Sequence, residues 1–455
     1  MESKIRKLNR FNSAVEPPRY ALSDFYRTAI KLIEQILAKN NVREALNCVV
    51  SNKGASGIDG MKVEELRDYM NANWTSIKQS ILERRYKPAP VRRVEIPKPN
   101  GGVRKLGIPT VVDRTLQQSI VQVLTPIFEA EFQDNSYGFR PGRSCEQAVQ
   151  KLLEYLNEGA EWIVDIDLEK FFDNVPQDKL MSYVGRVIHD PDTESLIRKY
   201  LKSGVMENGL YEATELGTPQ GGNLSPLLSN VMLNELDKEL VRRGLRYVRY
   251  ADDCVIAVRS EASAKRVMHS VTQWIERVLG LKVNATKTHV CRPSKLKYLG
   301  FGFYKSPQTK QWTARPHEDS VAKFVRKLKK LCKRSWSISM TARITMLNRV
   351  IRGWINYFAI GSMKGKMVGI DEHLHTMLRK VIWKQWKTPR KRAWGLRKLG
   401  ISNDLAKLTS YSGDRYEWVV RRTCVVRAIS KDVLTRRGLV SCLDYYAIRH
   451  SLKTN

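Results

Sequence analysis

The pattern of apolar and polar residues changes twice along the chain. Residues 1–20 are polar and basic, and apolar residues then follow helical spacing in Phe25–Leu37 and Arg43–Val50. From Val91 to Pro109 apolar and polar residues alternate on both sides of an Asn-Gly pair, which predicts a β-hairpin. After about residue 310, basic amphipathic helices replace the strands, most clearly over Val321–Lys333. The pattern therefore predicts a mixed α and β region followed by a helical one.

Two short segments place carboxylates beside strand-forming residues. Glu161–Leu168 alternates apolar residues with Asp165 and Asp167, so both acids share one face of a predicted strand. In Arg246–Val258, apolar runs flank two adjacent aspartates, a pattern typical of a hairpin with acids at its tip. Neighbouring carboxylates repel each other, and a divalent cation would neutralise them. An Asp-Asp pair also occurs in solvated turns, so the rest of the chain must decide between the two interpretations.

The distance along the chain between these acids constrains the fold. Asp167 and Asp252 are 85 residues apart, so a single site requires the strand and the hairpin to pair in one sheet. We expect that sheet to be antiparallel, with helices behind it.

Size and charge narrow the class of protein. A chain of 455 residues exceeds the length of one ordinary core, so we expect two or three domains. The 79 Lys and Arg residues outnumber 46 Asp and Glu, and the net charge of +33 indicates a polyanionic partner. An anionic membrane is the competing partner, but the sequence has no 18-residue apolar run and begins without the apolar segment of a signal peptide. We expect no membrane association and a cytoplasmic protein, associated with the nucleoid in a prokaryote.

Several common chemistries lack their sequence signatures. The seven cysteines are scattered and form no Cys-x-x-Cys pair, so we expect reduced packing residues instead of a zinc module or a disulfide framework. The sequence contains neither a His-Glu-x-x-His motif nor a Gly-x-x-x-x-Gly-Lys-Ser/Thr loop, which argues against a zinc hydrolase and an NTP-driven motor.

The basic helices carry a nucleic-acid signal. Seven of the twelve positions from Lys323 to Arg334 are Lys or Arg, and tryptophans recur among basic residues over the next sixty positions. A charge run is usually a solvated face, but basic residues interleaved with aromatic ones favour RNA. The candidate RNA-binding residues are Lys323, Arg326, Lys327, Lys330, Arg352 and Trp354.

Seven motifs occur in an order that resembles the reverse transcriptases encoded by group II introns. The likeness extends from about residue 40 to the C-terminus. The motifs are Arg92–Pro109, Ser136–Pro141, Asp165–Asp173, Pro219–Pro226, the tetrapeptide Tyr250-Ala-Asp-Asp253, Leu279–Asn284 with Lys287, and Lys297–Phe301.

The resemblance implies a fold and a set of metal ligands. The fold class is α+β: a right-hand polymerase whose fingers and palm contain an antiparallel sheet, followed by an α-helical thumb and a small C-terminal domain. Asp167, Asp252 and Asp253 match the catalytic carboxylates that hold two Mg²⁺ ions, for which Mn²⁺ can substitute. Asp165 is left out of this set, because only Asp167 has the family's spacing to the Phe-Phe pair; it remains a candidate to assist the ligands.

The resemblance also assigns the nucleotide site. Phe172 matches the steric gate that excludes a ribose 2′-hydroxyl, and Gln220 matches the residue beside the incoming nucleotide. Lys287 is a candidate general acid that would protonate the pyrophosphate. The residues that match the triphosphate-binding fingers are Arg92, Lys98 and Arg104.

The implied domains are an N-terminal extension with helices (1–75), the fingers and palm (76–308), the thumb or maturase X domain (309–395) and a DNA-binding domain (396–455). The implied partners are the group II intron RNA, an RNA template with a DNA primer, dNTPs and target DNA. The sequence shows no Cys- and His-containing endonuclease domain, as in the compact class C subgroup, so we expect priming from an existing DNA end. We expect a monomer, with a dimer through the N-terminal helices as the alternative.

The predicted function is that of an RNA-directed DNA polymerase that copies its intron RNA into cDNA during retrohoming and that promotes splicing as a maturase. A splicing cofactor with a vestigial polymerase is one alternative, although the intact carboxylates and Gln220 argue against it. A defence-associated or retron-like reverse transcriptase is the other, although such relatives usually lack this thumb.

Overall fold

The computed structural model describes residues 31–97, 102–207, 210–214, 216–218, 221–413 and 415–454. The chain forms two compact units. Unit 1 contains the described residues up to Phe132 and those from Phe172 to Met232, and unit 2 contains Gln133–Phe171 and the described residues from Leu233 onward. Each unit is considered by itself below.

Unit 1 contains a sheet with the strand order β2-β1-β4-β5. The alternating segment predicted as a hairpin forms its first pair, and the two strands are antiparallel, as expected from the sequence. The β1 strand also pairs in parallel with β4, through Val91 and Val205. The strands are β1 (Val91–Pro97), β2 (Val103–Ile108), β4 (Val205–Glu207) and β5 (Leu210–Glu212).

A long helix, α5 (Val111–Glu129), forms the centre of the helical part of unit 1, and α2, α3, α4 and α8 all contact it. Its N-terminus is capped by Thr110, whose side chain accepts a hydrogen bond from the backbone N–H of Asp113. The other helices that lie wholly in unit 1 are α2 (Leu32–Ile36), α3 (Lys39–Ser51), α4 (Leu66–Leu82), α8 (Gln177–Ile188) and α9 (Pro191–Leu201). Two helices cross the boundary between the units, α7 (Phe171–Asn174) and α10 (Ser225–Arg242).

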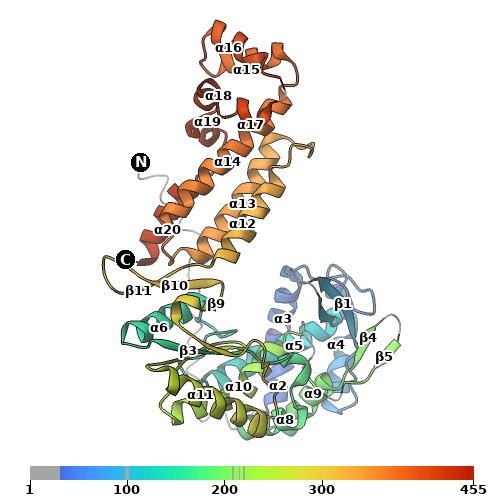
Figure 1. Ribbon diagram of the computed structural model, residues 1–455. Helices are drawn as coiled ribbons and strands as arrows, with labels where there is room; N and C mark the ends of the chain where they lie inside the picture. The colour runs from blue at the N-terminus through green and yellow to red at the C-terminus, as the bar shows by residue number, and fades with distance from the viewer. Residues whose placement is uncertain are drawn as a thin grey trace. The chain divides into compact units, whose positions relative to one another are not determined.

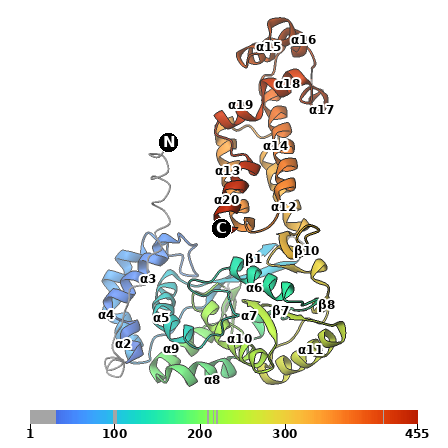
Figure 2. The ribbon, with the colours of Figure 1, turned by 90° about the vertical axis from the view of Figure 1, so that its left-hand side faces the viewer.

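Unit 2 contains an antiparallel sheet of order β6-β7-β3-β8, so the predicted pairing of the acidic strand with the acidic hairpin is confirmed. Figures 1 and 2 show α6 on one side of this sheet and α11 on the other. Successive residues of a strand point to opposite faces. Ile163 packs with the α6 core, while Val164 and Ile166 are buried on the opposite face. The elements are β3 (Trp162–Ile166), β6 (Arg246–Tyr250), β7 (Asp253–Val258), β8 (His289–Cys291), α6 (Cys145–Asn157) and α11 (Glu261–Trp274), which a π-helical turn (Ile275–Leu279) extends.

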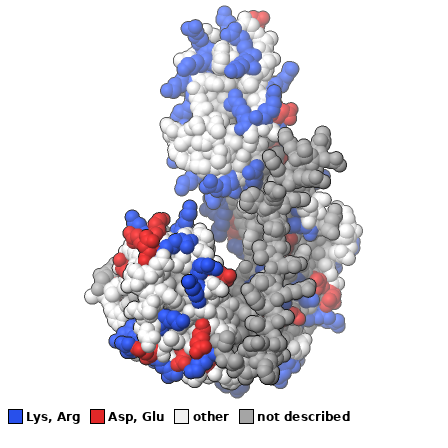
Figure 3. Space-filling view, turned by 180° about the vertical axis from the view of Figure 1, so that it is seen from behind, with Lys and Arg blue, Asp and Glu red and all other residues white. Residues whose placement is uncertain are grey.

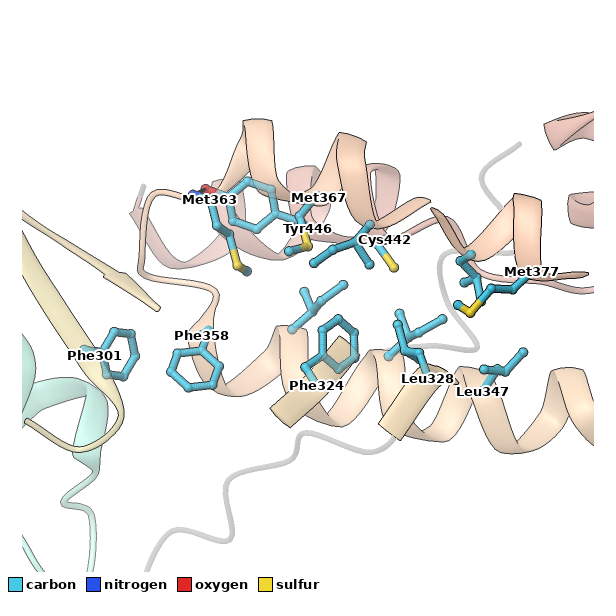
Figure 4. Close-up of a cluster of buried hydrophobic side chains, with 14 of the residues drawn as sticks. Phe301, Phe324, Leu328, Leu347, Phe358, Met363, Met367, Met377, Cys442 and Tyr446 are labelled. Atoms are coloured by element: carbon cyan, nitrogen blue, oxygen red, sulfur yellow. Dashed lines mark hydrogen bonds between the residues drawn. The ribbon is translucent and has the colours of Figure 1, made fainter. Parts of the chain in front are cut away.

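A small antiparallel sheet of order β11-β10-β9 follows in unit 2, and long helices come next. The predicted helix over Val321–Lys333 forms as α12, and its Phe324 and Leu328 pack against α13 and α14 in a continuous apolar core (Figure 4). The strands are β9 (Lys297–Tyr298), β10 (Phe301–Lys305) and β11 (Trp312–Pro316), and the three long helices are α12 (Glu318–Leu331), α13 (Met340–Phe358) and α14 (Lys364–Gln385).

The C-terminal residues share this core. Helix α20 packs against α13 and α14, and its Cys442 and Tyr446 belong to the same apolar cluster (Figure 4). Asp371 of α14 fixes the start of α20, because its carboxylate accepts hydrogen bonds from the backbone N–H groups of Cys442 and Leu443 at 2.8 and 2.9 Å. The remaining helices are α15 (Pro389–Lys398), α16 (Asn403–Ser410), α17 (Tyr416–Val419), α18 (Thr423–Ala428), α19 (Lys431–Arg436) and α20 (Cys442–Thr454). The four domain limits inferred from the sequence remain predictions.

All seven cysteines are free, and five of them are buried, in agreement with the expected packing role. Among the described residues, we find no helix with the length and the apolar character needed to span a membrane.

Candidate active site

The predicted acidic hairpin is confirmed and has a two-residue turn. Tyr250 pairs with Asp253, and Ala251 and Asp252 lie between them. Ala251 adopts a left-handed conformation, with a φ of 57°. Its carbonyl oxygen accepts a hydrogen bond of 2.9 Å from Nη1 of Arg249, which offsets the cost of that conformation for a residue with a Cβ atom. The turn therefore depends on the position of the Arg249 side chain.

A buried ion pair holds Arg249 in place. Its guanidinium is 1% exposed and the Asp237 carboxylate of α10 is 0% exposed. The Nε of Arg249 donates to Oδ1 of Asp237 at 2.8 Å, and its Nη2 donates to Oδ2 at 2.5 Å. Two parallel N–H donors facing one carboxylate fix direction as well as distance. Helix α10 thus sets the geometry of the acidic hairpin through the Asp237 side chain.

Asn135 and the start of the Ser136–Pro141 motif run beside β6. The N–H of Tyr137 donates to the carbonyl of Arg249, and the N–H of Arg249 donates to the carbonyl of Asn135, each at 2.9 Å. A Cβ atom on Gly138 would lie 2.2 Å from the backbone nitrogen of Ala251. Only glycine allows this close approach, so the motif supports the turn from outside the sheet.

Three carboxylates line one cavity of about 520 Å³ at the end of the sheet: Asp165, Asp167 and Asp253. Ile166 pairs with Cys254. Asp167 follows Ile166 and Asp253 precedes Cys254, so these two acids lie at the same end of the sheet. Asp252 is half-buried in the turn and does not belong to the cavity lining. The structure therefore brings together two of the three predicted ligands, together with Asp165.

Asp167 is fixed by the segment after β3. Its N–H donates to Oγ1 of Thr288 at 3.1 Å, and its carbonyl accepts from the N–H of Asn284 at 2.8 Å. The Nζ of Lys287 lies 3.3 Å from both carboxylate oxygens of Asp167. The predicted general acid therefore lies beside the central predicted metal ligand.

The carboxylates affect one another's ionisation. Loss of hydration in the cavity and then repulsion from Asp252, Asp165 and Asp167 raise the pKa of Asp253 to about 6, against the opposing effect of Lys287. Loss of hydration also raises the pKa of Asp165 to about 6; His289 opposes this rise and Asp167 adds to it. The lining also contains two lysines, Lys287 and Lys297, but Lys297 already pairs with Asp319, so the three carboxylates outnumber the lysine that remains for them.

The donor chemistry of the cavity fits hard divalent cations, because carboxylate oxygens are the ligands that Mg²⁺ prefers. In the part of the chain that is described, no three His, Cys, Asp or Glu side chains are arranged to hold one ion. Lys287 is instead the partner of Asp167. A bound cation would relieve the repulsion that Asp252, Asp165 and Asp167 exert on Asp253.

The residues predicted to hold the triphosphate lie in unit 1, on the β1–β2 hairpin. Arg92 and Arg104 share one face of this hairpin, since Arg92 pairs with Ile108 and Ile96 pairs with Arg104. The Nη2 of Arg92 donates to the carbonyl of Ser56 at 2.8 Å, and Arg104 is exposed. Two further predicted residues, Lys98 and Gln220, lie outside the described residues.

Phe172 lines a second cavity, of about 360 Å³, that lies wholly in unit 1. Its carbonyl accepts from the N–H of Thr218 at 2.7 Å, and a Cβ atom on Gly217 would lie 2.6 Å from the same carbonyl. The lining also contains Arg93 and Lys105, which the sequence analysis did not select. Alternation along the strands places Arg93 and Lys105 on the hairpin face opposite Arg92. The same alternation is visible in the sequence, so it could have identified these two residues as a second basic face.

The candidate RNA-binding residues lie on the helices of unit 2. The four basic residues selected on α12 are exposed, as is Arg352 of α13. Figure 3 shows many Lys and Arg and few Asp and Glu on one face of the helical end of this unit. Trp354 differs, because its half-buried ring stacks on Phe324 with centroids 4.4 Å apart and planes at 7°. Its ring therefore has a packing role, and its contact with RNA remains a prediction.

Comparisons with known proteins agree with these features. The model of the reverse transcriptase (RNA-dependent DNA polymerase) family matches residues 96–303, and that of the group II intron maturase-specific domain matches residues 321–400. Protein YkfC of Escherichia coli (strain K12) is 33% identical over 300 residues, which are 57% of this chain and 79% of YkfC. The group II intron-encoded protein LtrA of Lactococcus lactis subsp. cremoris is 36% identical over 249 residues, which are 52% of this chain and 40% of LtrA.

Among solved structures, a partial Cas6-RT-Cas1–Cas2 complex aligns with a TM-score of 0.35 and 22% identity, covering 57% of this chain and 44% of that chain. The matched polymerase region contains the acidic strand and hairpin, and reverse transcriptases in general depend on divalent metal ions. The chain therefore belongs to the group II intron-encoded reverse transcriptases, and it is an RNA-directed DNA polymerase joined to a maturase-specific domain.

Proposed function

We propose that this reverse transcriptase copies the RNA of its own group II intron into cDNA during retrohoming, and that it binds the same RNA as a maturase to promote splicing. One observation carries the catalytic part of the proposal. Asp167 and Asp253 line a single cavity with Lys287, at the end of a sheet whose hairpin turn is held by a buried ion pair. Such a fixed set of charges is what nucleotidyl transfer needs.

In this proposal Asp167, Asp252 and Asp253 hold two Mg²⁺ ions. When bound, the ions activate the primer 3′-hydroxyl and stabilise the leaving pyrophosphate, and Mn²⁺ can substitute for them. The position of Lys287 beside Asp167 supports its assignment as the group that gives a proton to the pyrophosphate. Asp165 shares the cavity, and we assign it to the support of the charged groups around Asp167.

The nucleotide-binding assignments belong to the same proposal. Arg92, Lys98 and Arg104 bind the triphosphate, Gln220 lies along the incoming dNTP, and Phe172 excludes the ribose 2′-hydroxyl. The shared hairpin face of Arg92 and Arg104 supports a joint role for these two residues. The hydrogen-bonded backbone of Phe172 supports a steric role for its ring, because a ring that excludes the 2′-hydroxyl must keep its position when a ribonucleotide approaches.

The maturase part of the proposal rests on the basic helices of unit 2. Lys323, Arg326, Lys327 and Lys330 are exposed on α12, within the region that matches the maturase-specific domain. Exposed ammonium and guanidinium groups bind phosphates without reading the base sequence. We propose that residues 396–455 bind target DNA. We expect the protein to act in the cytoplasm as a monomer.

Primer extension tests the polymerase assignment. The wild type should extend a DNA primer on an RNA template with Mg²⁺, and Asp253→Asn should reduce extension roughly 1,000-fold, the equivalent of about 4 kcal/mol of lost charge stabilisation. Asp178→Asn, which changes an exposed carboxylate in unit 1, is the matched control and should retain activity. A wild type that promotes splicing but does not extend the primer would leave only the splicing cofactor.

A further inference from the structure

We propose that a basic cavity at the end of α14 binds one unstacked nucleotide of an RNA loop or bulge, with its base on aromatic rings and its phosphate on lysines. The proposal rests on the RNA-binding role proposed above and adds a defined site and a ligand class to it. The residues that line the cavity come from α14, α15, α17 and the loops beside them, all within unit 2.

The cavity has a volume of about 310 Å³, within the range of roughly 300–1,000 Å³ that is usual for small-ligand sites. The loop between α12 and α13 forms one side, the C-terminal end of α14 forms another, and α15 and α17 complete it. The lining residues used here are Arg334 and Trp336 from the loop, Lys384 and Lys387 from the α14 end, Arg392 and Tyr416.

The lining combines positive charge with flat rings. Within the described part of the chain, Arg and Lys are the charged residues of the lining, and Asp and Glu are absent from it. The guanidinium carbon of Arg334 lies 4.2 Å from the centroid of the Tyr416 ring. Glu417, which follows Tyr416, already forms an ion pair with Lys380. Phosphate is the natural partner of such cations, and aromatic and guanidinium planes are the surfaces on which unpaired bases stack.

A buried arginine fixes the loop side of the cavity. Arg343 of α13 is 0% exposed, and its Nη2 donates to the carbonyl of Trp336 at 2.8 Å. Its Nη1 donates to the carbonyl of Leu331, the last residue of α12. Trp336 as a residue remains 40% exposed, and the guanidinium carbon of Arg343 lies 5.8 Å from its ring centroid. An exposed ring on a fixed backbone loses little freedom when a base stacks on it, and this favours binding.

The chemistry favours RNA as the ligand. Most of the lining, from Arg334 to Arg392, falls within residues 321–400, which match the group II intron maturase-specific domain. Unstacked bases are features of RNA loops and bulges, whereas duplex DNA keeps its bases stacked. A cavity that takes one base and its phosphate would recognise the position of an unpaired nucleotide in a folded RNA.

The test uses the full-length protein and two RNA hairpins that differ at one site. One hairpin carries a single-nucleotide bulge, and the other carries an abasic nucleotide at the bulge. Fluorescence anisotropy at constant salt measures both dissociation constants. Because stacking of one base typically contributes about 1–3 kcal/mol, we expect the wild type to prefer the bulged base roughly five- to 150-fold.

Two exposed tryptophans provide a matched comparison. Trp336→Ala should remove the preference for the bulged base. Trp394 is 55% exposed and has Lys398 Nζ 5.0 Å from its ring centroid, but it does not line the cavity. Trp394→Ala should therefore retain the preference. The comparison of base with abasic RNA cancels general phosphate attraction, which both hairpins share.

A second pair of variants keeps the proposal testable if loss of Trp336 disturbs the loop. Lys384→Ala combined with Lys387→Ala removes two exposed charges of the cavity, and Arg390→Ala combined with Lys391→Ala removes two exposed charges of α15 outside it. The first pair should reduce the preference for the bulged base, and the second should leave it unchanged.

Three results would overturn the proposal. They are equal affinity of the wild type for both hairpins, an unchanged preference in both the Trp336→Ala variant and the Lys384/Lys387 double variant, and an equal preference for a DNA hairpin of the same design. Primer extension by the same wild-type preparation is measured in parallel. An active polymerase without a base preference would refute the cavity alone, whereas a base preference without extension would refute the proposed polymerase function alone.

Discussion

Replacing Asp237 by Asn should destabilise the acidic β6–β7 hairpin, although Asp237 does not line the cavity. The substitution preserves size but leaves the Arg249 guanidinium, which is 1% exposed, without the carboxylate that now faces it. Removing one partner of a buried ion pair typically costs about 3–5 kcal/mol, because the remaining charge stays away from water. The Asp178–Arg198 pair is the control, with side chains 91% and 43% exposed. Asp178→Asn should cost at most about 1 kcal/mol.

Hydrogen exchange of the backbone amides of β7 measures this effect locally. A single free energy of unfolding is poorly defined for a chain with two compact units, whereas exchange reports the opening of one element. A loss of about 3–5 kcal/mol corresponds to a roughly 150- to 5,000-fold decrease in protection. The β7 amides should show this decrease in Asp237→Asn and at most about a fivefold decrease in Asp178→Asn.

A double variant separates stability from positioning. Asp237→Leu with Arg249→Met replaces the pair by apolar side chains, and such replacements of buried ion pairs are often neutral or stabilising. Protection of β7 should therefore recover. Primer extension should remain reduced, because methionine cannot donate the hydrogen bond of 2.9 Å that holds the Ala251 carbonyl. Equal protection in the two single Asn variants, or full activity in the double variant, would refute the reasoning.

Three further results are expected. Phe172→Ala should admit ribonucleotides in primer extension, because the bulk that would meet the 2′-hydroxyl is gone; unchanged discrimination would reject the steric gate. Binding of single-stranded RNA should fall steeply with salt, with a log–log slope near −4 if about six phosphates are neutralised, and a flat plot would contradict this. Hydrogen bonds from Arg242 and then Arg243 hold the pKa of Glu239 at about 2, so its stabilising effect is complete above pH 4.5 and is lost as the pH falls toward 2. Glu239→Gln removes this stabilising effect, so it should lower the melting temperature near pH 7 and flatten the dependence of the melting temperature on pH between 4.5 and 2, where the wild type and the variant should converge.

The sequence predicted the elements of the palm well because their patterns are local. Alternation of apolar residues and acids identified β3, and two apolar runs around Asp252 and Asp253 identified the β6–β7 hairpin. If the acids of both segments form one site, the strand and the hairpin must pair, and the sheet then has acids at one end. The same reasoning could predict that Arg92 and Arg104 share one hairpin face.

The supports of the site were not predictable in this way. Asp237 and Arg249 are separated by a helix end and a turn, and neither has a local pattern that indicates burial. Gly138 lies among turn-forming residues, which indicate a turn and no specific contact. In the structure it approaches Ala251 so closely that no Cβ atom fits at position 138. The Arg343 hydrogen bonds to the loop between α12 and α13 likewise depend on packing between helices. Contacts of this kind arise from tertiary structure and leave no periodic signal in the sequence.

Within unit 2, the proposed catalytic carboxylates and the proposed RNA-binding residues of α12 have different surroundings. The carboxylates depend on buried contacts, with Arg249 held by Asp237 and the Tyr298 hydroxyl 3.4 Å from the Val248 carbonyl. The basic side chains of α12 that we propose to bind phosphates are exposed. Substitutions in the first group should therefore change the rate of the chemical step, because small displacements of a preorganised charge weaken its effect on the transition state. Substitutions in the second group should change RNA affinity and its salt dependence, and each function can vary while the other is retained.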